Sequence, residues 1–539
     1  MNEYYIELFK EIEKRKLKTI DDVLKLRREL CRKFNPKSLP SIIEILMHAN
    51  YSQFKKLKFL ITKPSRTISG VTPIALMTKP SKCPHGKCIM CPGGINSVFG
   101  DVPQSYTGAE PSTMRGRRNN YDPYLTTFNR LEQYYLLNQS YDKVELIIQG
   151  GTFPALPLEY QNEFITYSLK ALNDFKFSLA QFKKFFELPS EMNPERTKRI
   201  QERILKLKGK SNLKKEQKRN ETSKIRCVGL TIETRPDYAK LEHANIMLEQ
   251  GCTRVEVGVQ TTNDKVLKII KRGHTVKDSI EAFRTLKDLG FKVHAHIMLG
   301  LPEDKNELMK IFDEDFRPDM LKIYPCMVMP GTELEILYNE KKFIPLTTND
   351  VIKILSKFKT QIPEYVRIMR IQRDIPTTQI IAGVDKTNLR QMLQEYMKKN
   401  NLHCNCIRCN EIKSKIENPK LEVIEYTASK GKEFYISFKQ EQEIIGYCRL
   451  RFPSQSLRNE ITKDSAIVRE LHVFGTAIGL EQKGTIQHKG FGKKLLKKAE
   501  EICKQNNKKK ILVISGIGVR EYYVKLGYSR DGPYVSKVL

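Results

Sequence analysis

Between residues 71 and 330, short apolar runs alternate with longer amphipathic stretches. Each run has the length of one strand, and each intervening stretch is long enough to form a helix. Strands separated by helices are typical of parallel βαβ units, so we expect a partial (β/α)6 barrel. The six expected strands are Val71–Met77, Val144–Gln149, Cys227–Ile232, Arg254–Val259, Val293–Leu299 and Leu321–Tyr324.

A cysteine-rich loop follows the first expected strand. It reads CPHGKCIMCPGG and contains Cys83, Cys88 and Cys91 within nine residues. Parallel barrels carry their chemistry at the carboxyl ends of the strands, and this loop begins at such an end. Three thiolates on one short loop can hold an iron–sulfur cluster with one iron open to a substrate, or a zinc ion with a fourth ligand from elsewhere. The loop alone leaves both alternatives open.

A second cysteine cluster lies beyond the expected barrel. The run HCNCIRCNE places Cys404, Cys406 and Cys409 within six residues, which predicts a structural zinc site that needs one more ligand. His403 is the nearest candidate, but ligands adjacent in sequence are sterically awkward, so a distant residue is the alternative. Because this cluster suits structural zinc, the first loop is freer to hold an iron–sulfur cluster.

The chain is strongly basic, with 94 Lys and Arg against 62 Asp and Glu and a formal net charge of +32. Such an excess attracts polyanions by counterion release, so RNA or DNA is the expected partner unless the source proteome is generally rich in lysine. The segment 193–226, with thirteen Lys or Arg and four Glu, predicts a charged helical or partly disordered insertion. The sequence shows neither a signal peptide nor a run of about 18 apolar residues, so we expect a soluble, cytoplasmic protein without membrane contact.

The last 120 residues change character and predict a separate α+β domain. Three runs, Phe434–Phe438, Ile444–Leu450 and Ala466–Val473, follow one another as antiparallel strands do. The run QHKGFGKKLLKKAEEIC then opens a helix, before the strand Ile511–Ser515. The whole chain is therefore expected to be α/β plus α+β. The expected domains are a basic helical region at 1–65, the barrel at 66–370 with its insertion at about 193–226, a zinc-binding linker at 371–420 and the α+β domain at 421–539.

Several longer motifs occur in order along the chain. They are the cysteine loop with its PGG, QSYTGAEP from Gln104, QGGTF from Gln149, LTIETRPD from Leu230, GCTRVEVGVQ from Gly251 and the C-terminal VRELHV, QHKGFG and VREYYVKLGY. Together they resemble the catalytic subunit of Elongator, of the archaeal type, over nearly the full length. That family joins a radical S-adenosyl-L-methionine (SAM) barrel to a GNAT acetyltransferase domain. Two features depart from the pattern: four residues separate the first two loop cysteines where three are usual, and Met90 stands where an aromatic residue is common.

The resemblance implies that the three loop cysteines hold a 4Fe-4S cluster whose open iron binds SAM. An electron donor then drives cleavage of SAM to a 5′-deoxyadenosyl radical. Gly150 and Gly151 would let the backbone approach the methionine moiety because they carry no Cβ, although a glycine pair after a strand is by itself only a turn signal. Glu233 and Arg235 would hold the ribose and the carboxylate by charge-assisted hydrogen bonds.

In the C-terminal domain the resemblance implies a site for acetyl-CoA. The glycine-rich turn before the helix matches a GNAT signature that binds the coenzyme pyrophosphate. The VRELHV strand would pair with the pantetheine arm. One of two adjacent tyrosines would protonate the departing thiolate and the other would contact the coenzyme, unless both are packed aromatics. The residues implied are Lys143, Glu470, Leu471, His472, Val473, Gln487, Gly490, Phe491, Gly492, Tyr522 and Tyr523.

For the whole protein, the resemblance implies formation of carboxymethyluridine at C5 of the wobble uridine of transfer RNA. The radical would take hydrogen from the acetyl methyl group, the carbon radical would add to uracil, and thioester hydrolysis would release the product. The anticodon stem-loop would contact the basic regions at 1–65 and 193–226, unless these are solvated helix surfaces. A protein lysine acetyltransferase, which needs only the GNAT domain, and a non-catalytic RNA-binding scaffold are the rivals. The sequence leaves open the choice of transfer RNA, the electron donor and whether the chain acts alone, as a homodimer or with partner subunits.

Overall fold

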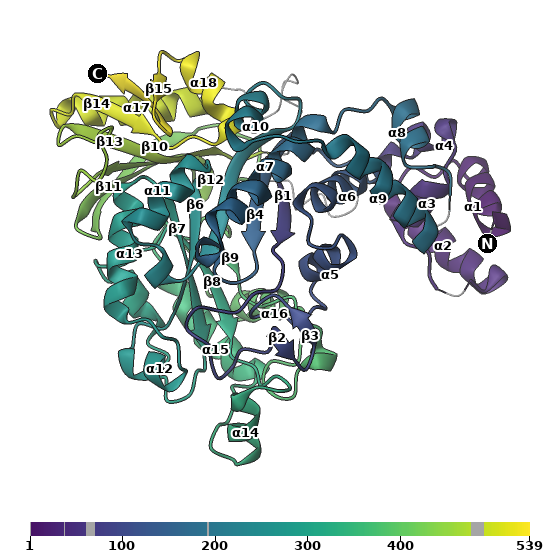
Figure 1. Cartoon of the computed structure of the whole chain (residues 1–539), viewed down its shortest axis with the longest axis horizontal. Coiled ribbons are helices and arrows are strands. Elements are labelled where there is room, and N and C mark those ends of the chain that lie inside the picture. Colours follow the sequence, from purple (N-terminus) through teal and green to yellow (C-terminus); the bar gives the residue numbers. More distant parts are fainter. Residues whose placement is uncertain (1, 37, 61–69, 191–192, 476–489) are drawn as a thin grey trace.

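The computed structural model describes residues 2–36, 38–60, 70–190, 193–475 and 490–539. The N-terminal region is helical, as expected, and forms an arm on one side of the molecule (Figure 1). This arm is anchored to the barrel domain, since the buried Lys183 ammonium donates a hydrogen bond of 2.7 Å to the carbonyl of Ala49. Its elements are α1 (Asn2–Lys14), α2 (Ile20–Phe34), α3 (Ile42–His48), α4 (Tyr51–Lys56) and the 3-10 turn Leu57–Phe59.

The central sheet is parallel throughout, with strand order β1-β4-β5-β6-β7-β8-β9. All six predicted strands are confirmed, and they build the expected partial barrel of parallel strands. The seventh strand was not predicted because RIMR, from Arg367 to Arg370, is short and half charged. The strands are β1 (Thr72–Met77), β4 (Lys143–Gln149), β5 (Arg226–Thr234), β6 (Arg254–Gln260), β7 (Lys292–Leu299), β8 (Met320–Pro325) and β9 (Arg367–Arg370).

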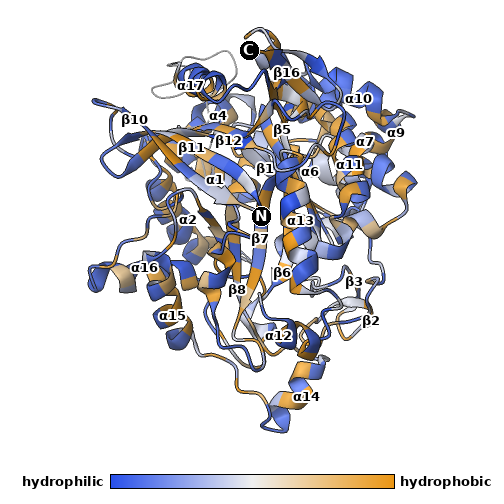
Figure 2. Cartoon of the chain, turned by 90° about the vertical axis from the view of Figure 1, so that its left-hand side faces the viewer, coloured by the Kyte–Doolittle hydropathy of each residue, from blue (hydrophilic) through white to orange (hydrophobic). Residues whose placement is uncertain are grey.

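Helices connect these strands because parallel neighbours need crossovers. Figure 2 shows α13 in front of β6 and β7, with hydrophilic and hydrophobic residues along the same helix. Its buried residues include Phe283 and Leu286. A capping box formed by Thr275 and Asp278 lies at its N-terminus. The segment 193–226 contains two helices, α9 and α10, joined by a short turn, with Ile200 and Ile204 of α9 buried. The helices are α5 (Pro111–Arg118), α6 (Pro123–Leu136), α7 (Leu158–Asp174), α8 (Leu179–Phe185), α9 (Pro194–Lys208), α10 (Leu213–Asn220), α11 (Leu241–Glu249), α12 (Asp264–Ile269), α13 (Val276–Asp288), α14 (Glu333–Asn339), α15 (Thr348–Thr360) and α16 (Leu389–Lys399).

The C-terminal domain is built on a second sheet, with order β10-β11-β12-β13-β14-β16-β15. The antiparallel pairing of β11, β12 and β13 confirms the expectation, whereas β13 and β14 are parallel because α17 crosses between them. The elements are β10 (Lys420–Ala428), β11 (Gly431–Gln440), β12 (Glu443–Phe452), β13 (Ser465–Val473), α17 (Phe491–Gln505), β14 (Lys510–Val513), α18 (Arg520–Val524), β15 (Ser529–Asp531) and β16 (Tyr534–Val538).

Buried ion pairs join this sheet to the barrel. Arg469 of β13 binds Asp319, which immediately precedes β8, and Arg451 of β12 binds Asp288 at the end of α13. All four side chains are fully buried. Buried pairs are costly to break, because the remaining charge loses its partner without regaining water. The network therefore fixes the C-terminal domain against the amino ends of the barrel strands, as Figure 1 shows.

Candidate active sites at the two ends of the barrel

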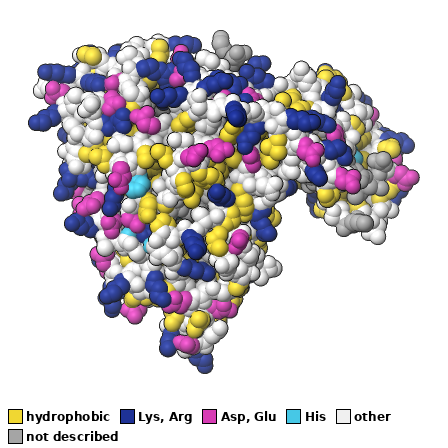
Figure 3. Space-filling view, viewed as in Figure 1, with side chains coloured by type: hydrophobic (Ala, Val, Ile, Leu, Met, Phe, Trp, Pro, Cys, Tyr) yellow, Lys and Arg dark blue, Asp and Glu magenta, His cyan; other side chains and the backbone are white. Residues whose placement is uncertain are grey.

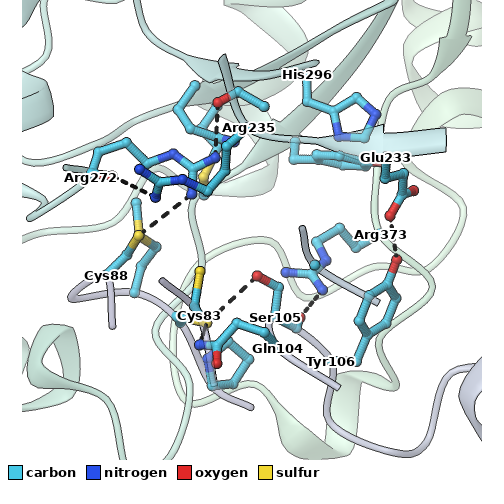
Figure 4. Close-up of a pocket in the computed structure, with 18 of the residues that line it drawn as sticks. Cys83, Cys88, Gln104, Ser105, Tyr106, Glu233, Arg235, Arg272, His296 and Arg373 are labelled. Carbon is cyan, nitrogen blue, oxygen red and sulfur yellow. Dashed lines mark hydrogen bonds between the residues drawn. The ribbon is translucent and has the colours of Figure 1, made fainter. Parts of the chain in front are cut away.

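A cavity of about 160 Å³ lies at the carboxyl ends of the barrel strands; we call it the carboxyl-end cavity. The structure brings together here the three loop cysteines and most of the barrel residues singled out in the sequence (Figure 4). Gly150 does not line the cavity, but a Cβ on it would lie 2.1 Å from the Thr78 hydroxyl, so only glycine fits beside β1. The predicted residues that line the cavity are Cys83, Cys88, Cys91, Gly151, Glu233 and Arg235.

The cysteine loop is arranged around one imidazole. His85 Nδ1 lies 3.0 Å from Cys83 Sγ and its Nε2 lies 3.1 Å from Cys88 Sγ, while Gln104 donates a hydrogen bond of 2.9 Å to Cys91 Sγ. Burial, with positive charge nearby, lowers the pKa of His85 to about 4, so the imidazole is neutral at pH 7. Three thiols facing one enclosed space are a donor set that fits an iron–sulfur cluster.

Two arginines provide positive charge beside the thiols. Arg272 Nη1 is 3.7 Å from Cys88 Sγ, and the buried Arg235 donates to Asp237 and to the carbonyl of Arg272. Burial raises the pKa of Cys83, and the two arginines oppose that shift. Their cations therefore favour thiolates, which are the form that binds metal. Since Arg235 is held by Asp237, its predicted contact with the SAM carboxylate stays a prediction.

Glu233 has several partners in the wall of the same cavity. Its carboxylate accepts hydrogen bonds of 3.2 Å from the Tyr106 hydroxyl and from Gln149 Nε2, and lies 3.6 Å from Lys322 Nζ. These contacts fix the carboxylate at the end of β5, where it can accept a further hydrogen bond. Sequence reasoning assigned no role to several lining residues, although QSYTGAEP was noted as a motif. They are Gln104, Ser105, Tyr106, Glu256, Arg272, His296, Tyr324 and Arg373.

A second cavity, of about 210 Å³, lies at the opposite end of the strands, between the barrel and β13; we call it the amino-end cavity. Of the residues implied for acetyl-CoA, four line it: Glu470, Leu471, His472 and Tyr523. Val473 instead lies beside Gly492, with its Cγ2 3.8 Å from where a Cβ on that glycine would be. Gln487 falls outside the described residues.

Of the residues in the glycine turn and the tyrosine pair that the structure describes, only Tyr523 lines this cavity. Gly490 has φ +84° and caps the N-terminus of α17, which begins at the buried Phe491. Tyr522 is 36% exposed, and its hydroxyl is 3.2 Å from the position that a Cβ on Gly492 would take. Tyr523 is 5% exposed and faces the cavity, and burial raises its pKa, so its hydroxyl stays protonated. The two tyrosines thus occupy distinct environments.

Lys143 is not among the residues that line the amino-end cavity. It is the first residue of β4 and is paired in register with Arg226, while Glu145, two residues later, does line the cavity. Partial burial lowers the pKa of Lys143. The implied role of Lys143 with acetyl-CoA stays a prediction.

The second cysteine cluster is compact enough for a single ion. The thiols of Cys404, Cys406 and Cys409 lie within 4.8 Å of one another, and His403 is exposed and outside this group. Lys359 of α15 lies beside the cluster, with Nζ 3.5 Å from Cys409 Sγ; burial opposes its charge, but the three cysteines raise its pKa. Three thiols suit zinc, and among the described residues no fourth ligand joins this group.

Four family models match the chain: the ELP3 N-terminal domain at residues 1–68, the Radical SAM superfamily at 78–314, the Radical_SAM C-terminal domain at 318–399 and the Acetyltransferase (GNAT) family at 394–528. A tRNA uridine(34) acetyltransferase of Methanocaldococcus infernus is 46% identical over 93% of this chain and 92% of its own length. Elongator complex protein 3 of Homo sapiens is 36% identical over 96% of this chain and 93% of its own length. A solved structure of the M. infernus Elp3 with an N-terminal deletion superposes with a TM-score of 0.71 at 40% identity, covering 88% of this chain and all of that one.

Proposed function

The chain belongs to the family of Elongator complex protein 3 and the archaeal tRNA uridine(34) acetyltransferases, and from this premise we propose that it modifies the wobble uridine of transfer RNA. The observation that carries the proposal is that one rigidly joined chain has a thiol-lined cavity at one end of its barrel and a tyrosine-lined cavity at the other. In the proposed reaction the methyl carbon of acetyl-CoA replaces the hydrogen on C5 of uracil. One methyl hydrogen ends on 5′-deoxyadenosine as SAM is cleaved, and the C5 hydrogen leaves as a proton. Thioester hydrolysis then gives carboxymethyluridine and free coenzyme.

At the carboxyl-end cavity, Cys83, Cys88 and Cys91 would hold the 4Fe-4S cluster. When bound, the cluster and SAM supply a 5′-deoxyadenosyl radical. The positive φ of Gly151, +104°, keeps the backbone open to a ligand at the end of β4. Arg235, which is 2% exposed, would keep positive charge beside the thiolates without competing water. Glu233 would accept a hydrogen bond from a ribose hydroxyl.

At the amino-end cavity, residues of this chain would bind acetyl-CoA and donate a proton to the departing coenzyme thiolate. The first N–H groups of α17, beginning after Gly490, would bind the pyrophosphate. The backbone of 470–473 would pair with the pantetheine arm, and Tyr522 would contact the coenzyme beside Gly492. Tyr523 would give its hydroxyl proton to the coenzyme thiolate as the thioester is cleaved. The raised pKa of Tyr523 keeps that proton available.

The basic surface would bind the anticodon stem-loop. Figure 3 shows Lys and Arg side chains spread over the N-terminal arm and the neighbouring face. In α9, α10 and the turn between them, some cations already pair with the protein, such as Arg199 with Glu187, whereas Lys206, Lys210 and Lys214 are exposed and can meet phosphate. Among the described helices, none is long and apolar enough to cross a membrane. We place the protein in the cytoplasm, with transfer RNA.

A pair of variants tests the proposal against a protein lysine acetyltransferase, which would need only the amino-end cavity. Cys88→Ala should abolish uridine modification while acetyl-CoA binding is retained. Tyr523→Phe should impair thioester cleavage while SAM binding is retained. If Cys88→Ala left all acetyl-dependent products unchanged, the cysteine loop would be structural and the proposal would fail.

A further inference from the structure

The two cavities lie at opposite ends of one barrel interior, and ion-paired side chains occupy the space between them. Glu256 of β6 lines the carboxyl-end cavity, and Arg254, two residues earlier, lines the amino-end cavity. Arg254 Nη2 lies 3.8 Å from Glu256 Oε1 and 2.8 Å from Glu145 Oε1. The cavities are therefore separated by side chains rather than by backbone.

The neighbouring strands repeat this arrangement. On β5, Gly229 lines the amino-end cavity and Glu233 the carboxyl-end cavity. Side chains two residues apart on a strand share a face, so Thr231 lies between the cavities and faces inward. Its hydroxyl donates a hydrogen bond of 3.0 Å to Glu145 Oε1. The same alternation places Lys322 of β8 in the middle layer, between Met320 and Tyr324, which line the two cavities.

This middle layer is charged, although the interiors of parallel barrels are usually filled by branched apolar side chains. Lys322 Nζ contacts Glu256 Oε2, and His294 Nδ1 and His296 Nε2 approach the same carboxylate at 3.1 and 2.9 Å. Burying such charges costs free energy that packed Val and Leu would not cost. A charged layer here therefore points to a role for the barrel interior beyond packing.

A metal ion is a poor explanation for the layer. Ligand atoms of Glu256, His294 and His296 do lie within 4.8 Å of one another. However, Lys322 and Arg254 already place two cations beside the Glu256 carboxylate. A divalent ion would have to displace the ammonium against like-charge repulsion.

We propose that the barrel interior is the passage by which the two-carbon end of acetyl-CoA reaches the carboxyl-end cavity, past a movable barrier formed by Arg254, Glu256 and Lys322. This inference rests on the proposed function, which requires the acetyl group at one end of the barrel to meet the cysteine loop at the other. Arg and Lys have long stems that can swing aside, and their N–H groups can donate to the thioester carbonyl as it passes. Branched apolar residues would offer neither property.

The test uses the full-length, cluster-free protein with bound transfer RNA and chloroacetyl-CoA as the probe. A cysteine thiolate displaces chloride from the probe's methylene carbon, and the resulting thioether is located by peptide mass spectrometry. Thr231→Cys places a thiol in the middle layer. Val255→Cys is the matched control, because Val255 and Thr231 are both 0% exposed, whereas Val255 packs in the apolar core beside Arg254.

We expect the Thr231→Cys thiol to be modified at least tenfold faster than the Val255→Cys thiol, and excess coenzyme A to slow that modification at least tenfold. Equal rates, or no effect of coenzyme A, would overturn the passage. If Thr231→Cys does not fold, His294→Cys replaces it as the probe of the middle layer, from β7. The same tenfold difference from Val255→Cys is then expected.

Ser515→Cys separates this inference from the function on which it rests, since Ser515 lines the amino-end cavity. If the Ser515→Cys thiol is not modified, acetyl-CoA does not bind in the amino-end cavity, and that part of the proposed function is wrong. If its thiol is modified while Thr231→Cys reacts only as slowly as Val255→Cys, the acetyl-CoA site stands and the passage is wrong.

Discussion

Arg469 and Asp319 form a two-pronged ion pair across the domain boundary, with Nη1–Oδ2 and Nη2–Oδ1 distances of 2.7 Å each. Asp319 also forms an ion pair with Arg449, and the two arginines hold the pKa of Asp319 well below its usual range. Because these side chains are buried, loss of either partner would leave a charge without a counterion or water.

Asp319→Asn should destabilise the protein strongly, by about 3–5 kcal/mol, because it leaves two buried guanidinium groups short of an anion. Thermal unfolding would measure the loss. Asp374→Asn is the control, since Asp374 pairs with Arg370 at the surface and such pairs contribute about 0–1 kcal/mol. Equal small effects of both variants would contradict a structural role for the buried network.

Tyr523→Phe should lower the rate of acetyl-CoA cleavage by roughly 10²–10⁴-fold while coenzyme affinity changes little, because the variant loses only the proton donor. Tyr522→Phe should instead weaken coenzyme binding with a smaller effect on rate. Steady-state assays of free coenzyme release, with binding followed by calorimetry, separate the two. The reverse pattern would exchange the roles of the two tyrosines.

Stability should fall as the pH drops below about 6.5. Burial lowers the pKa of His294 to about 3, so the unfolded chain binds a proton to this imidazole between pH 6.5 and 3 while the folded chain does not. At pH 5 this difference amounts to about 2 kcal/mol for one histidine. His294→Gln should flatten the dependence of melting temperature on pH in this window. An unchanged slope would show that His294 is protonated beside Glu256 in the folded protein.

Purified protein should contain one zinc ion per chain at Cys404, Cys406 and Cys409. Cys406→Ala should lose the zinc and lower the melting temperature, as zinc binding contributes to folding. His403→Ala should keep the zinc, because His403 is exposed and outside the thiol group. Elemental analysis measures the zinc content of each variant. Loss of zinc from His403→Ala would show that His403 is the fourth ligand.

The insertion should contribute to transfer RNA affinity through its exposed lysines. Replacing Lys206 and Lys214 by Ala should weaken binding and reduce the slope of log K against log salt by about 0.7–0.9 for each phosphate that the variant no longer neutralises. Replacing Lys504 and Lys509, which are exposed in the C-terminal domain, should change the slope less. Filter binding at several salt concentrations measures both. Identical slopes would remove the insertion from the interface.

Strands made of apolar residues could be predicted from the sequence, whereas strands that carry many polar residues could not. The six long strands were predictable because buried parallel strands are apolar runs, whereas β9 was missed because RIMR resembles a surface segment. Edge strand β10 was missed for a related reason: its first four residues are all exposed, so it resembles a surface segment.

In the sites, motifs identified the cysteines, the glycine pair and Glu233. They could not identify Glu256, His294 or Lys322, because alternating polar residues within a strand usually indicate a face in water. Only closure of the sheet shows that this face is the barrel interior. The contact of Arg235 with the carbonyl of Arg272 and the position of Lys359 beside the second cysteine cluster likewise depend on contacts distant in sequence.

The most direct test of the account is anaerobic reconstitution with transfer RNA, SAM, a reductant and acetyl-CoA labelled in its methyl carbon, followed by nucleoside mass spectrometry. The account predicts carboxymethyluridine that carries the label at the wobble position, with none formed by Cys88→Ala. Protein with an intact cluster, bound transfer RNA and no labelled carboxymethyluridine would contradict it.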